Sequence, residues 1–281
     1  MTTLRQLVLA TARRGNRTVL LTYPGLGVGN YLYFALRAYL FSGEGRDYRV
    51  TLDDGVRPWL AVMPELRSYF VEHSDVRLLE RREHISPSFF QTFGDDFNGD
   101  DLDRYITQKV LPSPLFNGWR ERSSQLAQDG VLTVNVRRGD YYATDAFRRI
   151  YGFDVASYVH VAVAEAHRDN GDFGRIHVVS DGVDWCRQHL PWLEDYTERV
   201  TFVGPADSPQ QHLVDVALSP TLILTNSTFS YWGAYISNVI HRANLSDVWA
   251  PRFFGRGLRA EGSSAWQLDP RWSVIEDVPG A

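Results

Sequence analysis

The sequence predicts an α/β protein of two domains, each built on a parallel sheet, that face one another across a cleft. In the second half of the chain, short apolar runs rich in β-branched residues alternate with helical stretches. This alternation is typical of a parallel sheet with helices on both faces. Near the start, a strand, a glycine-rich turn and an apolar helix occur in the order of a ligand-binding α/β unit. The length of 281 residues fits about two domains.

The elements expected in the first half begin with that unit. They are a strand at 18–22, a glycine-rich turn at 24–30, a helix at 31–41, a second strand at 49–52, short helices near 64–71 and 102–110, and a polar loop at 93–101. Residues 1–17 hold four arginines around a short apolar run. The run is too short for a signal-peptide core, so a short amphipathic leader helix is expected there.

The second half has a more regular pattern. Strands are expected at 131–136, 176–180, 200–203, 221–225 and 248–250, with helices at 155–168, 183–190, 211–218 and 229–240. The proline-bearing and glycine-bearing stretch from 111 to 130 separates the halves, which places the domains at 1–125 and 126–281. Ligands prefer the interface between two domains.

Composition excludes several classes of protein. A net charge of −5 gives no electrostatic case for nucleic-acid binding. A single cysteine excludes an intrachain disulfide and a cysteine-built zinc site, and it fits a cytoplasmic location. No apolar run approaches the roughly 18 residues that a membrane span needs.

The first candidate motif is Val-Asn-Val-Arg-Arg-Gly-Asp-Tyr at 134–141, where Arg137 and Arg138 end a strand and Asp140 follows. A guanidinium forks onto phosphate oxygens, and open α/β sheets bind ligands at the carboxyl ends of their strands. The motif therefore indicates a phosphate-bearing ligand with an acid or base beside it. The alternative is a salt-bridged surface turn, which an arginine pair alone would favour.

Two further motifs follow downstream. At 224–234, Asn226, Ser227 or Thr228 can cap a helix whose amino terminus would suit a phosphate, or the helix is a capped core helix without a ligand. At 177–186, a strand ends in Ser180 and Asp181, where a ribose or base contact is common. An N-cap role for Asp181 is the alternative.

Together these three motifs resemble the conserved motifs of the α-1,2-fucosyltransferases (glycosyltransferase family 11), and Pro-Gly-Leu-Gly-Val-Gly-Asn-Tyr at 24–31 resembles the glycine motif of that family. The resemblance spans about residues 20–251. It implies two Rossmann-like domains facing a cleft (the glycosyltransferase B-type fold), an inverting reaction without metal, and GDP-β-L-fucose as donor. The first domain would lie on the acceptor side, and the second would bind the nucleotide sugar. Asn135 stands where the family usually has histidine, Tyr31 replaces the usual glutamine, and the glycine loop is two residues longer.

The expected catalytic residues are Arg137, which would stabilise the departing diphosphate, and Asp140, as base or orienter of the acceptor hydroxyl. A salt bridge to Arg137 or Arg138 is the structural alternative for Asp140. The expected donor-binding residues are Gly25, Gly27, Asn30, Asn135, Arg138, Ser180, Asp181, Asn226, Ser227, Thr228 and Phe229. Arg138 supports Arg137 or forms a structural ion pair. Beyond the donor no cofactor and no metal site are expected, and the acceptor is a glycan or a glycosylated small molecule.

Other functions fit less well. Asp101 and Asp103 have the spacing of a metal-binding pair but lie outside any strand end. The Gly-x-Ser-x-Gly elbow of serine hydrolases is absent, and the glycines at 25–29 lack the spacing of dinucleotide-binding folds. Two alternatives remain: transfer from another nucleotide sugar to a natural-product acceptor, and a non-catalytic carbohydrate-binding protein.

Overall fold

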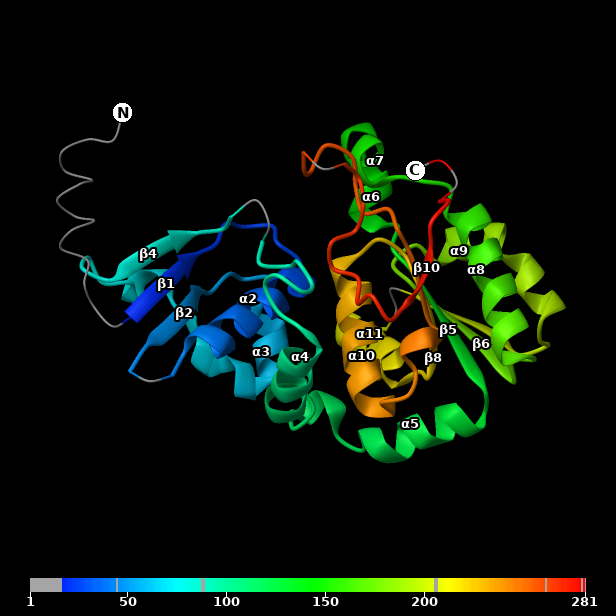
Figure 1. Cartoon of the computed structure of the whole chain (residues 1–281), viewed down its shortest axis with the longest axis horizontal. Coiled ribbons are helices and arrows are strands. Elements are labelled where there is room, and N and C mark those ends of the chain that lie inside the picture. The colour runs from blue at the N-terminus through cyan, green and yellow to red at the C-terminus, as the bar shows by residue number, and fades with distance from the viewer. Residues whose placement is uncertain are drawn as a thin grey trace. The chain divides into compact units, whose positions relative to one another are not determined.

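A computed structural model of the chain describes residues 17–280 except 44, 87–88, 205–206, 261 and 279. The chain divides into two compact units, Met1–Asn117 and Gly118–Ala281 (Figure 1). The predicted domain boundary at 125/126 falls inside α5, Trp119–Gln128. The predicted leader helix at 1–17 lies outside the described residues, except for Arg17, which begins the first strand.

The first unit contains a four-stranded sheet in the order β3-β2-β1-β4, and all its strand pairs are parallel. Its strands are β1 (Arg17–Leu21), β2 (Asp47–Thr51), β3 (Phe70–Val71) and β4 (Arg81–His84). Its helical segments are α2 (Val28–Phe41), α3 (Arg57–Val62), η1 (Pro64–Tyr69), η2 (His73–Asp75), α4 (Gly99–Tyr105), η3 (Ile106–Val110) and η4 (Pro114–Phe116). The predicted strand, turn and helix near the amino terminus are confirmed.

Several boundaries in this unit differ from the prediction. The helix predicted near 64–71 ends at Tyr69, and Phe70 and Val71 form β3 instead. Helix α2 begins at Val28, three residues before the predicted start, because the Gly27 carbonyl accepts the N–H groups of Asn30 and Tyr31. The predicted loop at 93–101 is wrong for its last three residues, which form the first turn of α4. Asn98 caps that helix, and the Asp101 carboxylate accepts the N–H of Asn98 in return.

The second unit contains a six-stranded parallel sheet in the order β10-β9-β8-β5-β6-β7. Its strands are β5 (Val131–Val136), β6 (Arg175–Ser180), β7 (Val200–Val203), β8 (Thr221–Leu224), β9 (Val248–Pro251) and β10 (Ser273–Ile275). Counted within the unit, this is the 3-2-1-4-5-6 order of the doubly wound nucleotide-binding fold. All five strands predicted here are confirmed, and β10 is an addition.

Helices cover both faces of this sheet, as predicted. Helices α8 (Val155–Asn170) and α9 (Val183–His189) lie on one face, while α10 (Pro209–Leu218) and α11 (Thr228–His241) lie on the other (Figure 1). The remaining helical segments are α6 (Gly139–Ala143), α7 (Asp145–Tyr151), η5 (Pro191–Asp195) and η6 (Leu245–Asp247). Helices α10 and α11 approach closely at Gly233, where an added Cβ would lie 2.4 Å from Val216 Cγ1.

The fold places its topological switch point between β5 and β8. These strands pair directly, with Asn135 opposite Leu224, and the chain continues from β5 to β6 on one side and from β8 to β9 on the other. Every residue of β5 is buried, as expected for a central strand of a doubly covered sheet. Open sheets of this kind bind ligands beyond the carboxyl ends of the strands at the switch point.

Candidate active site

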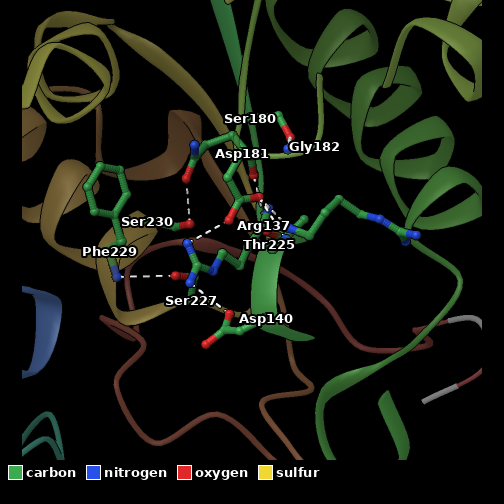
Figure 2. A network of polar contacts seen from close by, with 12 residues as sticks. Arg137, Asp140, Ser180, Asp181, Gly182, Thr225, Ser227, Phe229 and Ser230 are labelled. Atoms are coloured by element: carbon green, nitrogen blue, oxygen red, sulfur yellow. Dashed lines mark hydrogen bonds and ion pairs between the residues drawn. The ribbon is translucent and has the colours of Figure 1, made fainter. Parts of the chain in front are cut away.

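The candidate site lies at the switch point of the second unit, where β5, β6 and β8 end (Figure 2). The Thr225 hydroxyl accepts the Arg137 N–H at 2.8 Å and donates to the Asn135 carbonyl at 3.2 Å. The Thr225 N–H also donates to the Asn135 carbonyl at 3.1 Å. Thr225 therefore fixes the backbone from which Arg137 projects.

Arg137 is held between two carboxylates. Its Nη1 lies 2.6 Å from Asp181 Oδ2, and its Nη2 donates to Asp140 Oδ1 at 2.7 Å. Burial lowers the pKa of the Arg137 guanidinium, but the charges of Asp181 and Asp140 outweigh burial and leave the pKa raised. Arg137 is therefore a fixed positive charge that titration does not remove.

Asp181 fixes the turn that carries both arginines. Its Oδ1 accepts the N–H groups of Arg138 at 2.7 Å and Gly139 at 3.1 Å, while Oδ2 makes only the ion pair to Arg137 among the described residues. An added Cβ at Gly139 would lie 2.4 Å from Asp181 Oδ2, so the turn requires glycine there. The structure thus gives Asp181 a positioning role, and the predicted donor contact stays a prediction.

Arg138 lies in a different environment from its neighbour. Its guanidinium carbon is 3.5 Å from the ring centre of Tyr142 and 4.0 Å from that of Trp185. Burial lowers the pKa of Arg138, and the described residues place no carboxylate within ion-pair distance of it. The ion-pair alternative for Arg138 is therefore not what the structure shows. An added Cβ at Gly182 would lie 2.6 Å from Arg138 Cβ, so glycine there makes room for this side chain.

The amino terminus of α11 forms another part of the site. Ser227 is the N-cap, and its hydroxyl accepts the Phe229 N–H at 3.3 Å. Thr228 and Phe229, both half-buried, form the first turn. Asn226 does not cap the helix. Its buried amide donates to the carbonyls of Tyr151 at 2.9 Å and Phe254 at 2.8 Å. These bonds connect α7 and the loop that contains Phe254 to the site.

Asn135 and Ser180 belong to the buried frame behind the site. The Asn135 amide donates to the Val179 carbonyl at 3.0 Å, and its oxygen accepts the Ser230 hydroxyl at 2.5 Å. The Ser180 hydroxyl accepts the Gly182 N–H at 2.9 Å. These contacts tie α11 to β5 and shape the turn after β6. Sequence reasoning missed Thr225 and Ser230, although both lie within a motif that it identified.

An aromatic stack adjoins the arginine and was also missed. The rings of Tyr141 and Tyr151 stack at 4.2 Å with an interplanar angle of 12°. Phe147 stacks on Tyr151 at 6.4 Å and is 45% exposed. The Arg137 guanidinium carbon lies 5.6 Å from the Tyr141 ring centre. These rings come from α6 and α7, which the sequence did not predict.

The three predicted donor residues of the glycine loop belong to the first unit. Gly25 has φ +92°, a conformation that favours glycine, and Gly27 is the N-cap of α2. Asn30 Oδ1 accepts the side-chain amide of Gln91 at 2.7 Å. These contacts explain the turn and the helix start, and the part of Gly25, Gly27 and Asn30 in donor binding stays a prediction.

Neither a metal cluster nor a membrane helix is found in the described part of the chain. No group of three or more His, Cys, Asp or Glu side chains is arranged there to hold a metal ion. Asp101, half of the metal-like pair in the sequence, accepts the N–H of Asn98 in the capping box of α4 and pairs with Arg104 at 2.6 Å. No helix among these residues is long and apolar enough to cross a membrane.

Comparison with known proteins identifies relatives of the region that forms this site. Residues 87–244, more than half of the chain, match Glycosyl transferase family 11. An Alpha-1,2-colitosyltransferase from Escherichia coli is 25% identical over 120 residues, which cover 42% of this chain and 40% of that protein. The chain thus spans less than half the length of this relative. The family match contains all three motifs found in the second half of the sequence.

Proposed function

Because the chain belongs to glycosyl transferase family 11, we propose that it transfers L-fucose from GDP-β-L-fucose to a hydroxyl of a glycan or glycosylated small molecule, with inversion. The observation that carries this proposal is the position of Arg137 at the switch point of a doubly wound sheet, on a backbone fixed by Thr225 and Asp181. A fixed cation at this place in such a fold can stabilise the negative charge that develops on a departing diphosphate.

The proposed diphosphate site combines Arg137 with the amino terminus of α11. Arg137 offers a guanidinium that matches phosphate oxygens, and the helix offers N–H groups and the Ser227 and Thr228 hydroxyls. The fourteen residues of α11 give its amino terminus a partial positive charge. We infer that these groups stabilise the negative charge that grows on the leaving diphosphate, without a metal ion.

The proposed reaction is a single displacement at the anomeric carbon. The acceptor oxygen forms a bond to that carbon while the bond from the carbon to the diphosphate oxygen breaks. The bonding electrons stay on the departing GDP. The proton of the acceptor hydroxyl passes to the Asp140 carboxylate, which is 55% exposed and adjoins Arg137. In this proposal the first unit contributes acceptor contacts, and the protein acts in the cytoplasm.

A second donor deserves a direct test. The similar Escherichia coli protein is named as a transferase of colitose, which is L-fucose without its 3-hydroxyl. A donor carrying this sugar fits the same diphosphate site, since the sugars differ only in a group remote from the phosphates.

The test is a screen of nucleotide sugars with the full-length protein and a mixture of oligosaccharide and glycoside acceptors. Mass spectrometry would follow the transferred sugar mass and the release of nucleotide. We expect transfer from a GDP-linked 6-deoxyhexose, and the product mass separates fucose from colitose. Transfer from UDP-sugars only would refute the donor proposal. Binding of sugars without turnover of any donor would favour the carbohydrate-binding alternative.

A further inference from the structure

The charges around Arg137 are not those of an open phosphate site. One guanidinium is in contact with two carboxylates, at 2.6 Å to Asp181 and 2.7 Å to Asp140. These three groups sum to one negative charge. Each outer nitrogen of the guanidinium is already in contact with one carboxylate, so a diphosphate would meet two carboxylates beside the cation that the proposed function requires. Departure of one carboxylate would remove the excess negative charge and leave one outer nitrogen free to donate to a phosphate.

The two carboxylates are held very differently. The Asp181 side chain is 28% exposed and accepts two backbone N–H groups besides its ion pair. The Asp140 side chain is 55% exposed, and its ion pair with Arg137 is the one hydrogen-bonded contact of its carboxylate among the described residues. It is carried by α6, a helix of five residues. Asp140 is therefore the partner that a ligand can displace, and Asp181 is the one that stays.

We propose that the donor diphosphate takes the place of Asp140 on Nη2 of Arg137, and that the displaced carboxylate becomes available to the acceptor hydroxyl. This inference rests on the proposed function. The exchange replaces an exposed single-point ion pair with a phosphate, which carries more negative charge and offers more acceptor oxygens to Nη2 than a single carboxylate contact does. In the free protein, Arg137 holds the proposed base in a salt bridge. The donor must then bind before the acceptor is activated. Asp140 forms the salt bridge before the donor binds and acts as the base after it has bound.

The inference predicts opposite effects for the two carboxylates. Asparagine at position 140 cannot compete with phosphate as an anion, so Asp140→Asn should bind GDP more tightly. An exposed ion pair of this kind is worth a factor of about two to five in an equilibrium constant. Asp181→Asn should weaken GDP binding, because the uncharged amide no longer anchors Arg137. If Asp140 only supported Arg137 structurally, both substitutions would weaken binding.

The experiment is calorimetry of GDP with the full-length wild-type protein, Asp140→Asn and Asp181→Asn. Inorganic diphosphate serves as a second probe, because it lacks the guanosine part of GDP. Circular dichroism and thermal denaturation would check that each variant folds. If Asp181→Asn does not fold, Asp140→Asn and Asp140→Ala still decide the sign. Tighter binding by both position-140 variants supports the exchange, and unchanged or weaker binding overturns it. If the wild-type protein binds neither GDP nor diphosphate, the proposed function itself is refuted.

A kinetic readout separates exchange from a structural role. Loss of a general base costs about 10²–10⁴-fold in rate. We expect Asp140→Asn to combine tighter GDP binding with a fall of this size in kcat for transfer. We also expect an acceptor to bind the wild-type protein measurably better when GDP is present. A fall in kcat together with weaker GDP binding would contradict the exchange.

Discussion

Replacing Gly139 with alanine tests how tightly the arginine turn is built. The new Cβ would lie 2.4 Å from Asp181 Oδ2 and 3.5 Å from Arg137 Cζ. The carboxylate would have to move by about 1 Å to restore an ordinary contact, and it would then lose its place on the N–H groups of Arg138 and Gly139. Overpacking of this kind costs about 1–3 kcal/mol in the free energy of unfolding. A misplacement of about 1 Å in a catalytic group costs up to about 10²-fold in rate.

Thermal denaturation, GDP calorimetry and transfer kinetics would measure these effects. We expect Gly139→Ala to melt several degrees lower, to bind GDP more weakly and to lose about 10²-fold in kcat/KM. Gly27→Ala is the matched control for stability, since Gly27 has φ −74° and open space around its Cβ position. Its replacement should cost less than about 1 kcal/mol. A Gly139→Ala variant with wild-type stability and GDP affinity would refute the role given to Asp181.

Three further predictions concern other residues. Arg137→Lys should keep the fold but lose about 10²–10³-fold in turnover, because lysine lacks the guanidinium fork; wild-type rates in a folded variant would exclude the role of Arg137. Burial raises the pKa of the Cys186 thiol to about 11, so iodoacetamide should leave the folded protein unmodified at pH 7 and label it only after denaturation. Burial lowers the pKa of His241, which nevertheless contacts the Leu218 carbonyl. As the pH falls, the His241 imidazole is protonated in the unfolded chain before it is protonated in the folded protein. The neutral imidazole therefore favours the folded state fully above about pH 6.5, and this stabilisation is lost as the pH falls toward the pKa of His241 in the folded protein. Melting temperatures of the wild-type protein and of His241→Gln between pH 5 and 8 would show it, and identical pH profiles would contradict it.

The sheet of the second unit could be predicted because its central strands are buried on both faces and have apolar sequences. Strand β4, with the sequence Arg-Arg-Glu-His, could not be predicted, since it is a partly exposed edge strand without an apolar pattern. The polar helix α5 lacks a clear apolar face and was missed for the same reason. The short helices α6 and α7 show no apolar repeat either. Helix α7 is held by Tyr151, whose carbonyl accepts the Asn226 amide and whose ring packs against Phe254.

The site residues were found by their motifs, but several of their contacts depend on distant chain segments. Asn226, Ser227 and Thr228 are all able to cap a helix, and only the fold shows that Ser227 does so while Asn226 anchors two carbonyls. Asp181 accepts N–H groups from residues more than 40 positions earlier in the chain, which no local pattern reveals. The ion pair between Arg137 and Asp181 likewise needs β5 and β6 to be adjacent, whereas the pair with Asp140 is local in the sequence.

The central claim is that a nucleotide diphosphate binds at Arg137 and the amino terminus of α11, and a crystal structure of the full-length protein with GDP tests it most directly. We expect phosphate oxygens within about 3 Å of the Arg137 guanidinium and of N–H groups in the first turn of α11. Arg137 should still contact Asp181, and Asp140 should have moved away from it. GDP bound with its phosphates away from Arg137 and α11 would contradict the claim.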